Sequence, residues 1–359
     1  MHVAIEAIKL LNERRGIGRY MRNLLPQFAE RDPSLRVTMY VRRDDDIARL
    51  RTLLATLHAA LPERTTIAHV RDLPRTDADV VWYPWNFITI AAPHRPMVVT
   101  IHDVAPMLQL DHRWWKWLKR VRFKRRYQHT MHHAAAVLTV SEFSKGEIVR
   151  FLGADASRIS VTPLASVDLP VEGPDATRPL DEAGITGPFF LTVGGHEGRK
   201  NLPTLYAAMD ALYASGVHIP LVQCGPGMSS STRAVAGRAP WLHHVGFVSD
   251  AELATLYRRA AALVLPSRYE GFGLPVLEAM RAGCPVICAN SSALPEVAGD
   301  AALLFPWDDA AALAAHMTRL ANDPVLRAAQ IDAGTAHASR FSWSLVADQT
   351  LACFERVVS

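Results

Sequence analysis

Arg268-Tyr-Glu-Gly-Phe-Gly-Leu-Pro-Val-Leu-Glu278-Ala-Met-Arg-Ala-Gly283 is the most informative segment of this 359-residue chain. It follows an apolar run and contains Gly271 and Gly273, where the backbone can turn tightly and come close to a ligand. Pro275 is typical of the first turn of a helix, where its missing N–H costs nothing. Gly283 is typical of the residue just past a helix end. The segment therefore predicts a strand, a glycine-rich loop and a short helix.

Two glutamates lie on either side of the predicted helix start. Glu270 lies on the loop, and Glu278 lies about one turn into the helix. The uncapped N–H groups between them would attract a phosphate. Carboxylates are poor phosphate ligands but good acceptors for hydroxyl groups. The pair therefore indicates a site for sugars at either end of a pyrophosphate; the alternative is two solvated carboxylates on a well-capped helix.

A second glycine-rich turn, Gly194-Gly-His-Glu-Gly-Arg-Lys-Asn201, lies between another apolar run and another helical pattern. Arg199 and Lys200 place two cations where a diphosphate could lie. Such cations would stabilise the charge that grows on an anionic leaving group in the transition state. The turn alone could be a plain connection, but the glutamate segment downstream favours a phosphate site.

Strand and helix patterns alternate along the whole chain. In the first half we expect strands at 2–7, 37–41, 80–83, 97–101, 136–140 and 159–162. We expect helices at 17–31 and 47–60, and a third helix that Ser141 caps and that ends at Phe151. In the second half we expect strands at 189–193, 220–224, 262–265 and 285–289. We expect helices at 202–215 and 275–282, a helix that begins after Ser249 and ends at about Arg259, and further helices from 310 onward. Asn201 is expected to cap the helix at 202–215, and Ser249 with Glu252 forms a capping box. This alternation predicts an α/β fold with two helix-covered parallel sheets, which bind ligands beyond the carboxyl ends of their strands.

The composition is that of a globular protein, because 49% hydrophobic and 21% charged residues exclude a disordered or collagen-like chain. The four cysteines form no CxxC pair, so we expect buried free thiols in a reducing compartment. The N-terminus lacks the layout of a signal peptide. No apolar run approaches the roughly 18–20 residues that span a bilayer. We therefore expect a cytoplasmic protein, with peripheral contact at the inner face of the plasma membrane left open.

Together, these segments resemble the C-terminal domain of glycosyltransferase family 4, the retaining group 1 transferases of the GT-B fold. The spacing of Glu270 and Glu278 is the signature of that family, and further matches lie at 163–165, 246–250 and 294–305. The resemblance implies a GT-B-like fold, in which two Rossmann-like domains with parallel sheets face each other across an interdomain cleft. It also implies transfer of a sugar from a nucleotide donor with retention of configuration.

The resemblance implies roles for individual residues. Arg199 and Lys200 would hold the donor diphosphate, Glu278 would bind the ribose hydroxyls, and Glu270 would contact the donor sugar near the reacting face. His102 would also face the donor sugar, so the implied catalytic group is Glu270, His102, Arg199 and Lys200. Further contacts to the donor are implied at Gly16, Gly18, Gly195, Phe247, Val248, Gly273, Leu274 and Pro275. Among them, the Gly246–Val248 turn would lie against the base, and Leu274 and Pro275 would bring backbone N–H groups to the phosphates.

The N-terminal half contributes two of these matches. Gly16-Ile-Gly-Arg-Tyr20 resembles the first glycine-rich loop of the family, although its spacing also suits an ordinary strand–helix turn. His102-Asp103 resembles the His-Asp position of the family. A lone histidine is more often structural, but its place at the end of the strand at 97–101 favours a functional one.

A proline- and glycine-rich stretch within residues 165–187 suggests a linker. We expect an acceptor-binding domain at 1–168, the linker at 169–188 and a nucleotide-sugar-binding domain at 189–335. By the resemblance, residues 336–359 would form a helix that crosses back to the N-terminal domain.

Residues 111–127 combine basic and aromatic side chains. The basic residues are Arg113, Lys116, Lys119, Arg120, Arg122, Lys124, Arg125 and Arg126. Three interpretations remain open: a core-packed helix with a solvated basic face, a helix on an anionic membrane surface, or a nucleic-acid patch. The resemblance favours membrane contact through Arg113–Arg126, because many relatives act on lipid-linked acceptors, and no nucleic-acid partner is expected.

No aspartate-rich metal motif stands out at a strand end, so we expect no metal and no cofactor besides the nucleotide-sugar substrate. Likeness to bacterial polysaccharide mannosyl- and rhamnosyltransferases implies a hexose, mannose or a deoxy relative, moved from a GDP-sugar. The acceptor would be a glycan, possibly polyprenyl-linked, in surface polysaccharide or O-antigen assembly. The alternatives are an epimerase, a phosphorylase, or a non-catalytic membrane or nucleic-acid binder.

Overall fold

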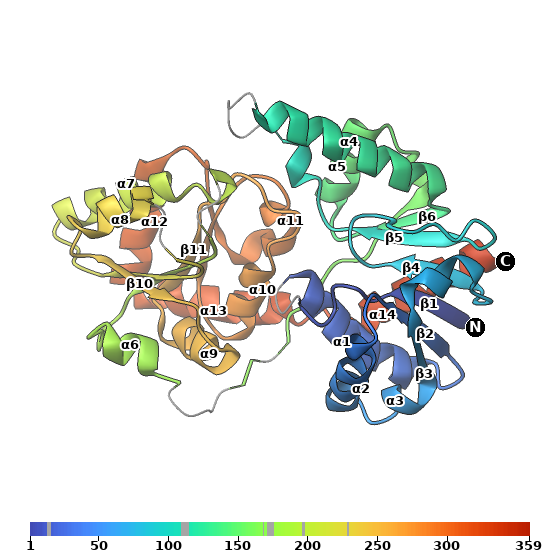
Figure 1. Ribbon diagram of the computed structural model, residues 1–359. Coiled ribbons are helices and arrows are strands. Elements are labelled where there is room, and N and C mark those ends of the chain that lie inside the picture. Colours follow the sequence, from blue (N-terminus) through green and yellow to red (C-terminus); the bar gives the residue numbers. More distant parts are fainter. Residues whose placement is uncertain (13–15, 109–114, 168, 171–175, 196–197, 228–229) are drawn as a thin grey trace. The chain divides into compact units, whose positions relative to one another are not determined.

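A computed structural model describes residues 1–12, 16–108, 115–167, 169–170, 176–195, 198–227 and 230–359 of the chain (Figure 1). The chain divides into two compact units. The first unit contains Met1–Leu164 and Ser342–Ser359, and the second contains Ala165–Phe341. These divisions lie close to the expected boundaries at 168 and 335, and the C-terminal segment belongs to the first unit.

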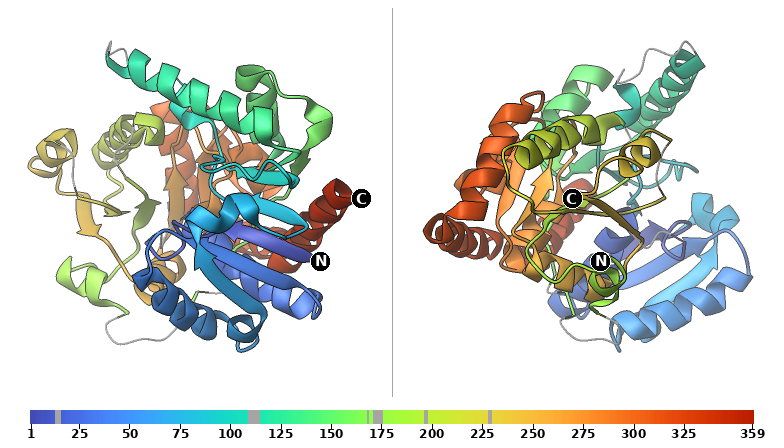
Figure 2. Two further views of the ribbon diagram at one scale, coloured as in Figure 1. Left: turned by 45° about the vertical axis from the view of Figure 1, so that its right-hand side comes forward. Right: turned by 90° about the vertical axis from the view of Figure 1, so that its left-hand side faces the viewer.

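The first unit is built on a parallel sheet with the strand order β3-β2-β1-β4-β5-β6-β7. Its strands are β1 (His2–Glu6), β2 (Arg36–Val41), β3 (Thr65–His69), β4 (Val80–Tyr83), β5 (Met97–Ile101), β6 (Ala136–Thr139) and β7 (Ile159–Val161). Its helices are α1 (Ile17–Arg31), α2 (Asp45–Leu57), α3 (Leu61–Arg64), α4 (Trp115–His133), α5 (Glu142–Leu152) and α14 (Trp343–Val358). Helices α1 and α2 lie on one side of the sheet, and α4 and α5 lie on the other (Figures 1 and 2).

The central strands of this sheet are buried along their whole length, as expected where helices cover both faces. The C-terminal helix α14 is part of the same core. Phe354 of α14 lies 5.6 Å, between ring centroids, from Trp82 of β4 and 6.3 Å from Phe28 of α1. Burial of one such aromatic side chain contributes about 1.5–3 kcal/mol, so α14 is tied to the first unit by apolar contact.

The second unit repeats the design with the strand order β10-β9-β8-β11-β12-β13, again parallel throughout. Its strands are β8 (Phe190–Val193), β9 (Leu221–Cys224), β10 (Leu242–Gly246), β11 (Ala262–Leu265), β12 (Val286–Ala289) and β13 (Leu303–Phe305). Its helices are α6 (Arg178–Glu182), α7 (Leu202–Ala214), α8 (Ser230–Ala236), α9 (Asp250–Arg259), α10 (Leu274–Arg281), α11 (Leu294–Ala298), α12 (Ala310–Asn322) and α13 (Pro324–Ala338). In each sheet the strand order reverses beside the first strand of the unit, between β1 and β4 and between β8 and β11.

Several local predictions are confirmed. Ser141 caps α5 through its hydroxyl, which accepts a hydrogen bond from the Ser144 N–H. Ser249 and Glu252 form the expected capping box at the start of α9. The four cysteines are buried and free. As a separate finding, no helix within the described ranges combines the length and the hydropathy of a bilayer span.

Other local predictions are wrong. Asn201 occupies the N-cap position of α7, but its side chain makes no capping hydrogen bond: the residue is left-handed, and its amide group donates to the Trp307 carbonyl at 2.6 Å. The helix expected at 47–60 ends at Leu57 and is followed by the separate short helix α3. The predicted strands omit β3, β10 and β13. These three strands lie at sheet edges, where one side lacks a neighbour and the polar or very short sequence gives no continuous apolar run.

Candidate active site

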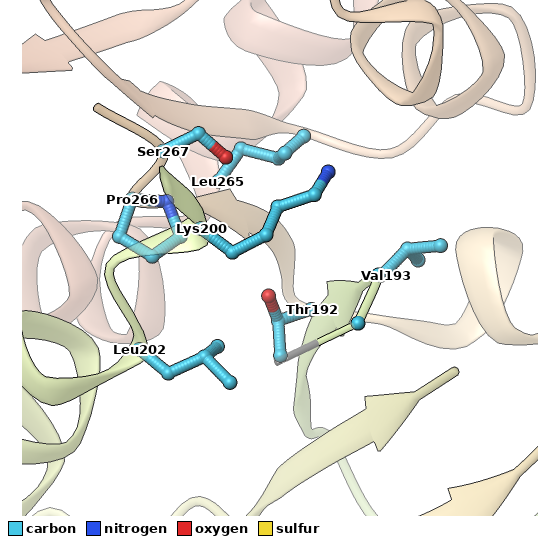
Figure 3. A pocket seen from close by; sticks show the side chains of 9 residues that line it. Thr192, Val193, Lys200, Leu202, Leu265, Pro266 and Ser267 are labelled. Carbon is cyan, nitrogen blue, oxygen red and sulfur yellow. The ribbon is translucent and has the colours of Figure 1, made fainter. Parts of the chain in front are cut away.

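A small pocket lies at the carboxyl ends of β8 and β11, where the strand order of the second sheet reverses. Its lining residues are Thr192, Val193, Gly194, Gly195, Lys200, Leu202, Leu265, Pro266 and Ser267. In Figure 3 the Lys200 side chain extends into this pocket from the segment that precedes α7. Open α/β sheets bind ligands at such reversal points, so the pocket marks the first place to look for a substrate.

Two glycines shape the loops around the pocket. Gly194 has a φ of +139°, and a Cβ atom there would lie 3.0 Å from Lys200 Cε. Gly225, which follows β9, has a φ of +154°, and a Cβ atom there would lie only 2.1 Å from the Gly194 carbonyl oxygen. The two strand-end loops therefore touch through backbone atoms, and Lys200 lies directly over the first of them.

Glu270 is held by both cations of the segment after β8. Arg199 Nη1 lies 2.8 Å from Glu270 Oε2, and Lys200 Nζ lies 2.7 Å from Glu270 Oε1. The carboxylate is buried. Burial by itself would raise the pKa of Glu270, but the charges of Lys200 and Arg199 outweigh it and hold this pKa below its usual value. The three side chains form one compact cluster with a net charge of +1.

Backbone contacts fix the chain around this cluster. The Arg268 N–H donates to the Arg199 carbonyl at 2.7 Å, and the Glu270 N–H donates to Ser292 Oγ at 3.0 Å. The Arg268 guanidinium stacks 4.3 Å from the Trp307 ring centre. The cluster is therefore held in place before any ligand binds. His196 and Glu197 of the same glycine-rich turn lie outside the described residues.

Helix α10 begins beside this cluster without a side-chain cap. Its N-cap is Gly273, whose φ of +101° is left-handed, and a Cβ atom there would lie 2.7 Å from Leu294 Cδ2. A helix start of this kind presents N–H groups to an anion. Only Leu274 of the expected phosphate-contacting pair can donate, because Pro275 has no N–H. At the other end Gly283 adopts the expected left-handed conformation, and the Cys284 N–H donates to the Ala279 carbonyl.

Glu278 lies inside α10 and is also buried. Its Oε2 accepts a hydrogen bond from the Tyr257 hydroxyl at 3.0 Å. Strand β10 ends at Gly246, which has a φ of +68°, and the next residue is Phe247, which is 57% exposed. A planar, exposed ring at a strand end offers a surface on which a base could stack.

The first unit holds the other expected residues. Gly16 is exposed, has a φ of +47° and precedes α1, while Gly18 is buried in its first turn. The His102 ring lies 5.0 Å, edge to face, from the ring of Tyr20. Its Nε2 lies 2.9 Å from the Pro84 carbonyl. A carbonyl can only accept, so Nε2 carries the proton and Nδ1 is left as an acceptor.

Burial lowers the pKa of His102 to about 4, although the Pro84 carbonyl acts in the opposite direction. The imidazole is therefore neutral at neutral pH. A neutral imidazole with a free acceptor nitrogen is suited to receive a hydrogen bond from a hydroxyl group rather than to supply a proton.

Comparison with known proteins identifies the family. The family model described as glycosyl transferases group 1 matches residues 182–337, and the one described as glycosyltransferase family 4 matches residues 14–165. The chain is 34% identical to the O-antigen chain mannosyltransferase B of Escherichia coli, over 77% of this chain and 74% of that protein. It is 30% identical to an MMP α-(1→4)-mannosyltransferase of Mycolicibacterium hassiacum, over 86% of this chain and 79% of that protein.

The chain belongs to the group 1, family 4 glycosyltransferases. This family 4 glycosyltransferase also resembles solved structures in its fold. Sucrose-phosphate synthase from Thermosynechococcus elongatus superposes with a TM-score of 0.73 at 19% identity, over 99% of this chain and 98% of that chain. Anabaena HepE in complex with UDP and glucose superposes with a TM-score of 0.72 at 16% identity, over 99% of this chain and 100% of that chain. The GT-B fold class expected from the sequence is confirmed.

The structure brings part of the expected site of this glycosyltransferase together. Arg199, Lys200 and Glu270 are in direct contact, and Gly195 lines the adjoining pocket. The other expected donor residues of the second unit are Phe247, Val248, Gly273, Leu274, Pro275 and Glu278. Gly16, Gly18 and His102 lie in the first unit. Within the described ranges, no three His, Cys, Asp or Glu side chains form a group that could hold a metal ion.

Three residues of interest were not predicted. Gly225 follows β9 in a Cys-Gly-Pro sequence, which signals a tight strand-end turn. Tyr257 gives no sequence signal of its contact with Glu278. Glu6, at the end of β1, is buried and accepts a hydrogen bond from Thr89 Oγ1 at 2.7 Å. Burial raises the pKa of Glu6, and its Oε2 has no hydrogen-bond partner among the residues that the structure describes.

Proposed function

We propose that this glycosyltransferase transfers mannose from GDP-mannose, with retention of anomeric configuration, to a glycan acceptor on a lipid carrier. The observation that carries the proposal is the contact of Arg199, Lys200 and Glu270 beside a pocket at the strand-order reversal. The curated relatives named above are mannosyltransferases, one of them acting on O-antigen chains. All of them are transferases, which favours transfer over the epimerase, phosphorylase and non-catalytic alternatives.

The cation pair supplies the leaving-group chemistry in this proposal. The bond between the anomeric carbon and the phosphate oxygen breaks, and both electrons pass to the diphosphate. Arg199 and Lys200 stabilise this growing charge, with the N–H of Leu274 at the start of α10. Attack by the acceptor hydroxyl on the same face retains the configuration, and its proton passes to the departing phosphate oxygen.

The remaining polar groups would orient the donor. Glu270 and Glu278 are buried. Their carboxylates form strong, charge-assisted hydrogen bonds with hydroxyl groups. Glu270 would hold the donor sugar, and Glu278 the ribose. His102 Nδ1, an acceptor at neutral pH, would accept a hydrogen bond from a hydroxyl group of the donor sugar.

A donor screen tests the proposal. GDP-mannose, UDP-glucose, UDP-N-acetylglucosamine and dTDP-rhamnose are titrated by calorimetry into the wild type, Glu278→Ala and, as a control, Glu355→Ala. Glu355 is an exposed glutamate of α14. We expect GDP-mannose to bind most tightly, with at least about tenfold weaker binding in Glu278→Ala only. Tightest binding of another donor would refute the GDP-mannose assignment, and equal binding in all three proteins would refute the Glu278 site.

The second part of the proposal concerns helix α4, which the structure describes from Trp115. Tyr127 and Thr130 are buried and attach the helix to the first unit, where Phe123 packs 6.1 Å from Phe87. The exposed side is basic, with Arg122, Lys124, Arg125 and Arg126, and Leu118 is 57% exposed. Arg113 and Trp114 lie outside the described residues. The helix therefore packs on the core and also offers a basic face.

We infer that this face binds anionic headgroups at the inner surface of the plasma membrane, which would bring the enzyme to a lipid-linked acceptor. Flotation with phosphatidylglycerol-containing liposomes at low salt tests this. Charge reversal of Arg122, Lys124 and Arg125 to glutamate should abolish co-flotation. Reversal of the exposed Arg42 and Arg43 is the control and should leave it intact. The membrane role would be refuted if the wild-type protein did not co-float with these liposomes.

A further inference from the structure

Tyr257 is a fully buried tyrosine whose hydroxyl group meets the carboxylate of Glu278. It lies on α9, which packs against α10, and its exposed fraction is 0%. The hydroxyl donates to Glu278 Oε2 at 3.0 Å. Burial, together with the nearby charge of Glu278, raises the pKa of Tyr257 well above its usual value. The phenol therefore stays protonated and acts as the donor.

This hydrogen bond constrains the carboxylate. A glutamate side chain has several rotatable bonds, and a carboxylate on the inner side of a helix can turn about the last of them. A phenol that is itself locked in the core fixes one oxygen. The orientation of the whole carboxylate is thereby set, including that of Oε1. Hydrogen bonds to an ionised acceptor are stronger than neutral ones, so this constraint is substantial.

The same helix also defines the turn assigned to the base. Helix α9 begins at Asp250, directly after the Gly246–Val248 turn, and its start is fixed by the Ser249–Glu252 capping box. Its interior then supplies Tyr257 to Glu278. A single short helix therefore sets the spacing between the exposed Phe247 ring and the buried carboxylate. In the proposed donor site, a nucleoside would contact the first point through its base and the second through its ribose.

We propose that Tyr257 is a positioning residue that orients Glu278 for the ribose hydroxyls and thereby sets the preference of the donor site for ribonucleotides. The proposal rests on the proposed function, in which Glu278 binds the ribose. It assigns Tyr257 a role in specificity that packing alone does not require, because phenylalanine would fill the same volume.

The test compares two nucleotides that differ only in the ribose. GDP and 2′,3′-dideoxy-GDP are titrated into the wild type, Tyr257→Phe, Glu278→Gln and Tyr206→Phe. Tyr206 is a matched control, because it is also buried in the second unit and donates to a buried side chain, Gln223 Oε1, at 2.7 Å. The quantity measured is the ratio of the two dissociation constants, which cancels changes in base or phosphate binding.

We expect dideoxy-GDP to bind the wild type at least about tenfold more weakly than GDP, since two hydroxyl contacts are lost. In Tyr257→Phe this ratio should fall at least about threefold, with dideoxy-GDP affinity unchanged. It should fall in Glu278→Gln and stay at the wild-type value in Tyr206→Phe. Adding Tyr257→Phe to Glu278→Gln should change the ratio no further, because Tyr257 acts only through Glu278.

If Tyr257→Phe has the same ratio as the wild type while the ratio falls in Glu278→Gln, the inference is overturned and the proposed function stands. If the ratio of the wild type itself is near one, or if GDP does not bind, the ribose role of Glu278 is overturned and the inference with it. If Tyr257→Phe does not fold by circular dichroism, 3-fluorotyrosine at position 257 keeps the ring and the hydroxyl, and its fluorine makes the hydroxyl a stronger hydrogen-bond donor to Glu278, so the ratio should change. An unchanged ratio with that residue would also overturn the inference.

Discussion

Replacing Glu270 with glutamine should tighten the binding of GDP. Both cations assigned to the donor diphosphate are already engaged by Glu270, at 2.8 and 2.7 Å. A diphosphate entering the site must share or displace this carboxylate. In Glu270→Gln the cluster keeps its shape, but its charge rises from +1 to +2. GDP lacks the sugar that Glu270 would contact, so the nucleotide gains attraction and loses no hydrogen bond.

The size of the effect follows from the positions of the three side chains. Two unit charges 4 Å apart interact by about 4 kcal/mol at an effective dielectric constant near 20. The Arg199 and Lys200 side chains are 28% and 13% exposed, so solvent screens part of this interaction. We expect about 1.4–2.8 kcal/mol to remain, which corresponds to about 10- to 100-fold tighter binding.

Calorimetric titration of GDP into the wild type, Glu270→Gln and Lys200→Ala measures this directly. Lys200→Ala should bind GDP more weakly, which shows that the cation contacts the phosphates. Transfer activity should fall in both variants. Weaker GDP binding in Glu270→Gln would mean that the carboxylate organises the cations and does not compete with the nucleotide, and it would refute the charge argument.

Three further outcomes are expected. Gly225→Ala should lower the melting temperature by several degrees and weaken GDP binding, because its Cβ would lie 2.1 Å from the Gly194 carbonyl; an unchanged melting curve would contradict this contact. Ser249→Ala removes one half of the capping box and should cost about 1 kcal/mol in thermal unfolding, whereas the same change at the exposed Ser339 should cost almost nothing. The pKa of His102 is lowered from 6.5 to about 4 in the folded state, so its contribution to stability is complete above pH 6.5 and is lost as the pH falls toward 4. In chemical denaturation between pH 7 and 4.5, His102→Gln should therefore lose less unfolding free energy than the wild type, and the difference should be at most about 1.4 kcal/mol per pH unit. Equal losses of unfolding free energy in the two proteins would contradict a neutral, buried imidazole.

The central strands and the main site motifs could be predicted from the sequence for one physical reason. Strands buried on both faces are mostly apolar, so 80–83 and 262–265 appear as uninterrupted apolar runs with clear ends, and only Thr100 interrupts the run at 97–101. The edge strands β10 and β13 have no such requirement. Residues 242–246 include two histidines, and 303–305 are too few to form a pattern.

The contacts within the site could not be predicted in the same way. Arg199 and Glu270 are far apart in the sequence, and only the parallel pairing of β8 with β11 brings the loops that follow them together. The same holds for Tyr257 and Glu278, which meet because α9 and α10 pack against each other. The requirement for glycine at position 225 is likewise set by the Gly194 carbonyl on another loop, so no local pattern reveals it.

Mannosyl transfer followed by NMR tests the central claim most directly. The enzyme is incubated with GDP-α-mannose and a panel of hydrophobic mannosides, and the anomeric signals of the first-formed product are assigned. We predict an α-mannosidic product that forms with the wild type and is lost in Lys200→Ala. A β-linked product would contradict retention, and equal transfer by Lys200→Ala would contradict the assignment of the donor site to the Arg199–Lys200–Glu270 cluster.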